Sequence, residues 1–279
     1  MRIAYLLPAP GVPVQGPSGA SAHVRGLVDG LREDHDVRLY AASRQDHRGR
    51  FGDETAAVIT GVRPWPRVVG RFRDQQEINT ARALARRVCA DAWAGWRPDV
   101  VIERHTLFSD AGWRVRDRLG VPWVLEVNAP STIERARFEE LRHPERAAAW
   151  ERRVLQAAPV VVAVSRWLVR WLQEEMGCRN VVWVPNGVPA LRGDRARGRA
   201  LLGLHENEPL IGYIGGDREW HDVGVLARVA DAAGARLALV GKLDTVPGGA
   251  IAPGHLPPQA LADVVAALDV ALAPYTAVA

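Results

Sequence analysis

The chain has 279 residues, of which 48% are hydrophobic and 24% charged, and its formal net charge at pH 7 is +4. This length supports one large domain or two of ordinary size, and the composition is typical of a soluble globular protein rather than a fibrous or disordered one. No apolar run is long enough to cross a bilayer and the first residues lack the layout of a signal peptide, so we expect a cytoplasmic protein.

Cysteine and basic residues narrow the classes of ligand. Cys89 and Cys178 lie far apart and belong to no Cys-x-x-Cys or Cys/His pattern, so we expect two buried thiols and no zinc site. Lys242 is the only lysine and every other strong base is arginine, which suits a phosphate-rich ligand, although GC-rich codon usage is the explanation we favour. There is no basic helix or aromatic–basic RNA motif, so we predict no nucleic-acid partner.

Strand and helix patterns alternate through the first half of the chain. The expected strands are residues 2–7, 37–41, 57–60, 99–102 and 123–127, and the expected helices are residues 20–31, 75–93, 110–119 and 132–157, the last with a break near Pro144. This alternation indicates a parallel, doubly wound α/β sheet, in which ligands bind at the carboxyl ends of the strands.

A second α/β pattern follows residues 160–188, which read as a strand, a capped helix, a second strand and a Pro-Asn-Gly turn. The polar residues 190–199 predict a domain boundary, so we expect one domain over 1–188 and another over 189–279. In the second domain the expected strands are residues 210–214, 236–240, 250–252 and 270–273, and the expected helices are residues 223–233 and 257–267. About one more helix and strand would be needed to close its sheet, so we expect this domain to be incomplete.

A glycine-rich loop, GPSGASAHVRGLVDGL at residues 16–31, directly follows the first strand. Small residues let backbone N–H groups approach a phosphate, and the N-terminus of a helix adds favourable partial charge. The loop is neither a G-x-G-x-x-G fingerprint nor a Walker A motif, and no acidic residue ends the second strand, so a dinucleotide site is not indicated. The alternative interpretation is a tight turn with a buried His23.

Two segments of the second half carry related patterns. IGYIGGDREWHDVGVL, residues 211–226, is a strand that runs into a loop and a helix, with a surface turn as the alternative interpretation. The other segment begins with LALVGK and ends with DVALAPY, at residues 269–275. In order with the glycine-rich loop and residues 160–188, these patterns resemble the nucleotide-sugar glycosyltransferases of the glycogen-synthase-like retaining group (glycosyltransferase group 1, family 4). The resemblance spans nearly the whole chain.

This resemblance implies a GT-B fold, in which two Rossmann-like domains face a cleft, here with the second domain cut short. It implies transfer of a sugar from a nucleotide diphosphate sugar to an acceptor, with retention of configuration and with no metal or other cofactor. Residues 1–188 would form the acceptor-side domain, and residues 189–279 the donor domain. A sugar, a lipid and a small molecule all remain open as acceptors.

Several site residues follow from the resemblance. The glycine-rich turn of the family lies beside the diphosphate, which assigns Ser18 and Gly19 to phosphate binding. In the family's donor loop an Arg and a Lys neutralise the leaving group. Gly216 and His221 stand at those positions here, and Arg218 supplies a charge two residues further on. The other donor-binding positions implied are Gly215, Ile251, Ala252 and Tyr275, with backbone contacts to the base at Ile251 and Ala252.

The loops after the fourth and fifth expected strands, VIERHTLF and LEVNAP, carry further polar residues. A His after the fifth strand often lines the donor sugar in the family, and Asn128 takes that place here. Asn128 can hydrogen-bond a sugar hydroxyl, and His105 can do that or carry a proton, with a solvated loop histidine as an equal alternative. Glu103 and Glu126 can bind sugar hydroxyls or pair with Arg104, and we favour the ion pair.

Basic and apolar residues interleave in GVRPWPRVVGRFR, residues 61–73. Such a mixture can seat a protein on anionic lipid, so a peripheral contact with the inner face of the membrane stays open beside the favoured interpretation, a solvated loop against the core. We expect Trp167 and Trp171 to pack rather than to contact a membrane. Asp34 and Asp36 match a D-x-D metal pattern superficially, but they precede a strand, and we predict no metal site.

Two alternatives to a working transferase remain. The family's Glu-x(7)-Glu motif, which holds the donor sugar and ribose, would follow Tyr275 and is absent. With Gly216 and Asp222 at unusual positions, this supports a truncated or degenerate member that binds a nucleotide without turnover. The second alternative is a nucleotide-sugar epimerase of the same fold, which needs acid/base carboxylates that we cannot place.

Overall fold

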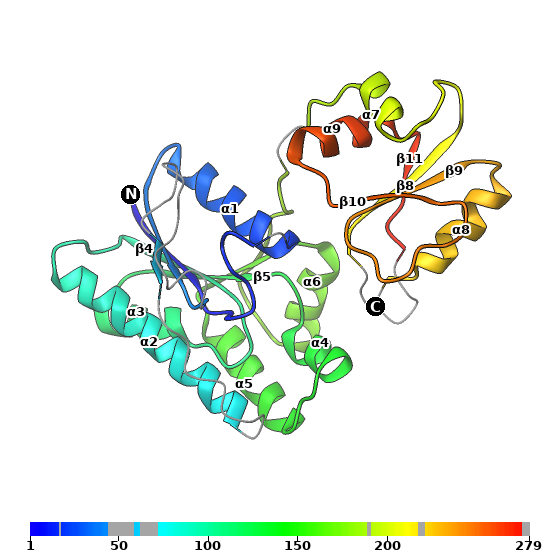
Figure 1. Cartoon of the computed structure of the whole chain (residues 1–279). Coiled ribbons are helices and arrows are strands. Elements are labelled where there is room, and N and C mark those ends of the chain that lie inside the picture. Colours follow the sequence, from blue (N-terminus) through cyan, green and yellow to red (C-terminus); the bar gives the residue numbers. More distant parts are fainter. Residues whose placement is uncertain (17, 44–58, 62–71, 189–190, 217–220, 275–279) are drawn as a thin grey trace. The chain divides into compact units, whose positions relative to one another are not determined.

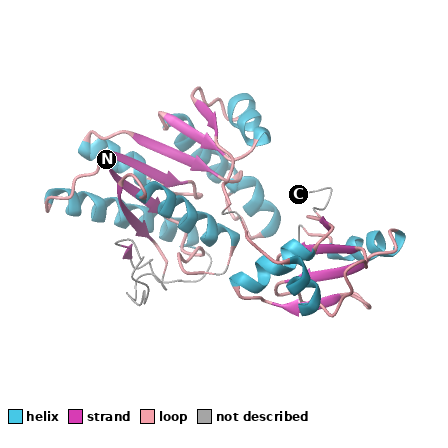
Figure 2. Cartoon of the chain, turned by 90° about the horizontal axis from the view of Figure 1, so that it is seen from above, coloured by secondary structure: helices cyan, strands magenta, loops and turns pink. Residues whose placement is uncertain are grey.

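The computed structural model describes residues 1–16, 18–43, 59–61, 72–188, 191–216 and 221–274. The chain divides into two compact units, Met1–Val188 (unit 1) and Pro189–Ala279 (unit 2). Each unit has its own parallel β-sheet with helices on both faces (Figures 1 and 2). No helix in the described ranges is both long enough and apolar enough to cross a membrane.

Unit 1 contains a seven-stranded sheet in the order β3-β2-β1-β4-β5-β6-β7, and all of its strand pairs are parallel. The strands are β1 (Arg2–Leu7), β2 (Asp36–Ala41), β3 (Ile59–Gly61), β4 (Val100–Arg104), β5 (Trp123–Val127), β6 (Val160–Ala163) and β7 (Val181–Trp183). The helices are α1 (Gly19–Arg32), α2 (Arg73–Trp93), α3 (Ala111–Leu119), α4 (Ser131–Phe138), α5 (Pro144–Ala157), α6 (Arg166–Arg170) and the π-helical turn η3 (Trp171–Glu175). The expected doubly wound parallel sheet is therefore confirmed.

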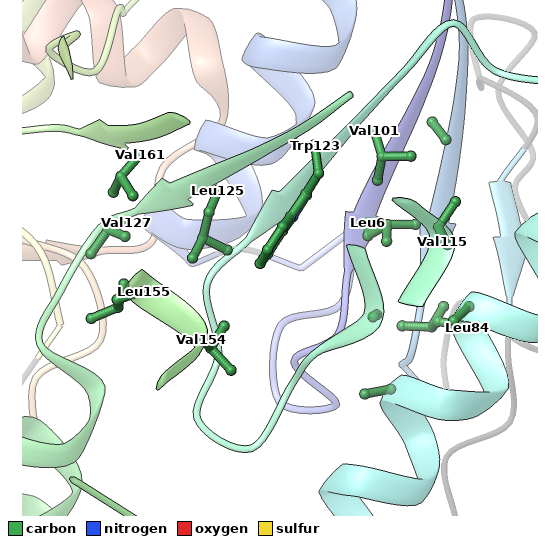
Figure 3. Close-up of a cluster of buried hydrophobic side chains, with 14 of the residues drawn as sticks. Leu6, Leu84, Val101, Val115, Trp123, Leu125, Val127, Val154, Leu155 and Val161 are labelled. Atoms are coloured by element: carbon green, nitrogen blue, oxygen red, sulfur yellow. The ribbon is translucent and has the colours of Figure 1, made fainter. Parts of the chain in front are cut away.

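The two faces of this sheet bury different side chains, because successive strand residues point to opposite faces. On one face Leu6, Val101 and Leu125 pack with residues of α2, α3 and α5 in the larger core (Figure 3). On the other face Tyr5 packs with Val24 of α1. This alternation decides which polar strand residues face α1.

The structure confirms the break near Pro144, which begins α5 and separates it from α4. It also confirms that Cys89 and Cys178 are buried and unpaired. Trp171 is buried, whereas Trp167 is half exposed and stacks on the Trp171 ring.

Unit 2 contains a four-stranded parallel sheet in the order β10-β9-β8-β11. The strands are β8 (Leu210–Ile214), β9 (Arg236–Val240), β10 (Ile251–Gly254) and β11 (Val270–Ala271), and the helices are α7 (Arg195–Leu201), α8 (Val223–Ala232) and α9 (Pro258–Ala267). Helix α8 covers one face of the sheet, and α7 and α9 cover the other.

Helix α7 lies where the sequence predicted only a domain boundary, at residues 190–199, so that prediction missed a helix. Asp194 caps the helix by accepting a hydrogen bond from Arg197 N at 2.8 Å. The buried residues of α7 are Gly198 and Arg199, so the segment lacks the aliphatic spacing that predicts a helix. A Cβ atom at Gly198 would lie 2.0 Å from the carbonyl oxygen of Asp263, which shows how closely α7 approaches α9.

The stability of unit 2 should depend on pH through Asp263. Hydrogen bonds from Arg197 Nε at 3.0 Å and from Asp194 N at 2.8 Å lower the pKa of this carboxyl to about 2. Because the unfolded value is about 3.9, the stabilisation is complete above about pH 4 and is lost as the pH falls toward about 2. Urea unfolding of α7 and α9, followed by amide NMR signals across this range, measures the effect.

The Asp263→Asn variant should lose most of this pH dependence. The matched control Asp231→Asn, at an exposed position on α8, should keep it. An equally steep dependence in the Asp263→Asn variant would contradict the assignment.

Candidate functional site

The carboxyl ends of β1 and β5 gather a hydrogen-bonded cluster around Glu126. Glu126 is the penultimate residue of β5, and its side chain is 5% exposed. It accepts hydrogen bonds from Tyr5 Oη at 2.7 Å and from Asn128 Nδ2 at 2.6 Å, and its Oε1 lies 2.5 Å from His23 Nε2. Burial alone would raise the pKa of Glu126, but the hydrogen bonds from these three neighbours hold it below its ordinary value. Glu126 is therefore an anion that orients the side chains around it.

Strand alternation explains why these residues meet. Leu125 and Val127 point into the core shared with α2 and α3, so Glu126 between them points to the face on which α1 packs. Arg104 lies on the neighbouring strand, with its Nη1 atom 3.5 Å from Glu126 Oε1. The ion pair favoured from the sequence is confirmed for Glu126.

For Glu103 the expected ion pair is wrong. Glu103 points to the opposite face of β4 and is fully buried. It accepts hydrogen bonds from Ser109 Oγ at 2.5 Å and from Gly112 N at 2.8 Å, at the start of α3. Burial raises the pKa of this carboxyl. Glu103 thus holds the first turn of α3 against β4.

His105 lies in the interior of unit 1 rather than on a solvated loop. Its Nε2 atom is 2.9 Å from Glu151 Oε1, and the two side chains are 2% and 1% exposed. Glu151 also accepts hydrogen bonds from Ser131 N at 2.8 Å and Thr132 N at 3.2 Å, so it caps the start of α4. In this structure the His105 ring positions a helix-capping carboxylate and is closed to a ligand.

The glycine-rich loop is held by its own side chains. Ser18 is the N-cap of α1, and its Oγ accepts a hydrogen bond from Ser21 N at 3.1 Å. Arg25 Nη1 donates to the carbonyl oxygens of Val14 at 2.5 Å and Gly16 at 2.9 Å. Gly19 opens the helix, and a Cβ there would meet open space. The loop thus brings the start of α1 to the carboxyl end of β1, where a helix favours anions.

In unit 2 the loop after β8 begins with Gly215 and Gly216 and resumes at His221. The His221 Nδ1 atom lies 2.7 Å from Tyr213 Oη and 3.3 Å from the carbonyl oxygen of Gly216. The two rings meet edge to face, with their centroids 5.6 Å apart. Tyr213 therefore orients the imidazole at the carboxyl end of β8. Arg218 lies outside the described residues.

Ile251 and Ala252 begin β10, an edge strand of the described sheet in unit 2. Only one side of this strand pairs with β9, which leaves backbone groups on its other side for a ligand. Tyr275 lies outside the described residues, as do residues 62–71 of the basic–apolar segment. No group of three or more metal-ligating side chains occurs in the part of the chain that the structure describes.

The contacts of His23 and Tyr5 with Glu126 were not predicted from the sequence. The available signal was a polar residue inside each of two apolar strands, RIAYLL and WVLEV. Both residues fall at positions that face α1. A pattern of this kind in two strands of one sheet predicts a shared contact beneath the covering helix.

Two units with parallel sheets covered on both faces agree with the expected GT-B fold, and solved structures of glycosyltransferases are similar to this chain. Sucrose-phosphate synthase from Thermosynechococcus elongatus is similar over 100% of this chain and 77% of its own, with a TM-score of 0.70 and 18% identity. Starch synthase IV from Arabidopsis thaliana is similar over 98% of this chain and 78% of its own, with a TM-score of 0.62 and 13% identity.

Residues 17–191 match the model of Glycosyltransferase Family 4, and the chain belongs to this family. The resemblance found in the sequence is therefore confirmed. D-inositol 3-phosphate glycosyltransferase from Nocardia farcinica is 31% identical over 139 residues, which are 47% of this chain and 31% of that protein. The chain thus matches about a third of the length of this curated relative.

Proposed function

We propose that this chain takes part in the transfer of a sugar from a nucleotide diphosphate sugar to an acceptor hydroxyl. The observation that carries the proposal is the family match over residues 17–191. Two similar structures contain a bound nucleotide. Anabaena HepE, at 15% identity, is in complex with UDP and glucose, and starch synthase IV is bound to ADP and acarbose. We infer that unit 2 binds the donor and that unit 1 binds the acceptor.

The leaving diphosphate needs positive charge and N–H groups as the sugar–phosphate bond breaks. We assign the fixed charge to Arg218 and a hydrogen bond to His221, whose ring Tyr213 orients. Ser18 and Gly19 at the start of α1 offer the N–H groups of a helix N-terminus. Transfer without a metal and with retention of configuration, at the cytoplasmic face of the membrane or in the cytoplasm, belongs to the same proposal.

Two relatives are named for the acceptor D-inositol 3-phosphate, which is a phosphorylated polyol. A phosphorylated polyol therefore joins a sugar, a lipid and a small molecule as candidates. Asn128 uses its amide nitrogen on Glu126, so its Oδ1 atom is the group that can accept a hydrogen bond from a hydroxyl.

Calorimetric titration with UDP, ADP and GDP tests donor binding. His221→Ala should weaken binding of the preferred nucleotide about tenfold, the usual effect of losing a hydrogen bond to a charged group. His205→Ala is the matched control, because this exposed side chain precedes β8 and lies at the opposite end of the sheet.

Turnover is tested with UDP-glucose and D-inositol 3-phosphate as the probe pair. Release of UDP only when both are present supports transfer. Nucleotide binding without release would favour the non-catalytic alternative, which Gly216 at the usual arginine position supports. Failure of all three nucleotides to bind would contradict the proposed donor site.

A further inference from the structure

Lys242 carries a positive charge at the carboxyl edge of the sheet in unit 2, and the fold does not use this charge. It is the only lysine of the chain and lies two residues after Val240, the last residue of β9. The residue is exposed. Among the residues that the structure describes, its ammonium group makes neither an ion pair nor a hydrogen bond. The group is therefore available to a ligand.

The described arginines of unit 2 are paired or lie elsewhere in the unit. Those that form ion pairs with carboxylates are Arg195, Arg197, Arg199 and Arg236. Two arginines have no such partner among the described residues, but Arg192 precedes α7 and Arg228 lies within α8. Lys242 is therefore the base that the described part of unit 2 places, unpaired, just after the carboxyl end of a strand.

Backbone contacts hold the loop after β9 against the loop after β8. Gly215 N donates a hydrogen bond to the carbonyl oxygen of Val240 at 2.9 Å. A Cβ atom at Gly216 would lie 3.7 Å from the carbonyl oxygen of Lys242. Lys242 thus lies directly beside Gly216, although 26 residues separate the two along the chain.

This neighbour is the position at which the donor loop lacks a charge. Gly216 stands where the family's loop carries an arginine. Because β8 and β9 are adjacent parallel strands, the loops that follow them share the edge at which ligands bind. The His221 imidazole, held by Tyr213, and the start of α8 belong to the same edge. A lysine on the second loop can therefore reach a ligand that the first loop holds.

We propose that the ammonium group of Lys242 binds the diphosphate of the nucleotide donor and replaces the charge that is missing at Gly216. The inference rests on the proposed function. Lysine offers three N–H donors and a positive charge, which stabilise the negative charge that grows on the leaving nucleoside diphosphate. Lys242 supplies this charge together with Arg218, so the site does not need an arginine at residue 216.

Titration of the full chain with UDP, ADP and GDP tests this contact without turnover. Lys242→Met keeps a long unbranched side chain but removes the charge and the donors. Affinity for the preferred nucleotide should fall about tenfold, the usual effect of losing a hydrogen bond from a charged group. Arg236→Met is the matched control, because it removes one positive charge at the opposite end of β9 from an exposed side chain. Its affinity should equal that of the wild type.

A double substitution distinguishes a binding role from a structural one. A Cβ atom at Gly216 would make one ordinary contact, with Lys242 O, and the φ of this glycine is not in the left-handed region, so arginine can be placed there. Gly216→Arg in the Lys242→Met background should recover most of the tenfold loss, because it returns a positive charge to the same site. A structural defect at residue 242 would not be repaired in this way.

The outcomes separate this inference from the proposed function. Equal nucleotide affinities of the wild type and Lys242→Met would overturn the role of Lys242 and leave the proposed donor site intact. An equal loss in Arg236→Met, or a loss that Gly216→Arg does not repair, would overturn that role as well. A wild type that binds none of the three nucleotides would overturn the proposed donor site, and the role of Lys242 with it.

Discussion

Replacement of Gly241 by alanine should weaken nucleotide binding by unit 2 about tenfold or more. Gly241 follows β9 with φ +132°, a backbone conformation that alanine rarely adopts. A Cβ atom there would lie 1.9 Å from the carbonyl oxygen of Gly215, so the loop after β8 would have to move. Backbone strain of this kind costs about 1–3 kcal/mol, and 1.4 kcal/mol is tenfold in affinity. Titration with the preferred nucleotide measures the effect.

The matched control is Gly248→Ala in the loop between β9 and β10. A Cβ atom at Gly248 would meet no atom within 4 Å, and its φ is not in the left-handed region. This variant should bind the nucleotide like the wild type. Equal affinities for the Gly241→Ala and Gly248→Ala variants would show that the approach of Gly241 to Gly215 does not shape the donor site.

Substitution of Arg199 by methionine should destabilise unit 2 by about 3 kcal/mol, because each hydrogen bond from a charged donor contributes about 1.5–3 kcal/mol. Its side chain is 3% exposed. Nη1 donates to the carbonyl oxygens of His205 at 2.8 Å and Glu208 at 2.7 Å, and Nη2 donates to Asp269 Oδ2 at 2.9 Å. Methionine fills similar space but leaves two backbone carbonyls and the partly exposed Asp269 carboxylate without this donor. Urea unfolding measures the change in free energy.

Arg195→Met provides the comparison. Arg195 binds the same carboxylate, with its Nη2 atom 2.6 Å from Asp269 Oδ1, but its side chain is 42% exposed. Water can replace this contact, so the loss should be under about 1 kcal/mol. Similar losses for Arg195→Met and Arg199→Met would refute the structural role of burial at Arg199.

Most elements of unit 1 were predictable because their local patterns agree with their environments. β1, β4 and β5 are short apolar runs in a sheet covered on both faces, and Pro144 ends one helical pattern and begins another. Helix α7 could not be predicted in this way. Its close contact with α9 uses Gly198 and Arg199, and neither residue type marks a buried helix face.

The candidate site was predictable in location rather than in contacts. Parallel strands bring their carboxyl ends to one edge, so polar residues such as Asn128 and His105 were expected there. The sequence could not show that His105 is closed by Glu151 from α5, since 46 residues separate the two. Whether Ser18, Gly19 and His221 bind phosphate stays a prediction for the titrations.

By itself the sequence determined the alternation of strands and helices, the doubly wound class and the family resemblance, because these follow from local periodicity and short motifs. Only the tertiary structure decided that Glu126 meets His23, 103 residues away, and that Glu103 turns from Arg104 toward α3. The physical reason is that a strand residue points to one of two faces, and the helix packed on that face supplies its partner. The chemistry of the site depends on such partners, which lie far apart along the chain.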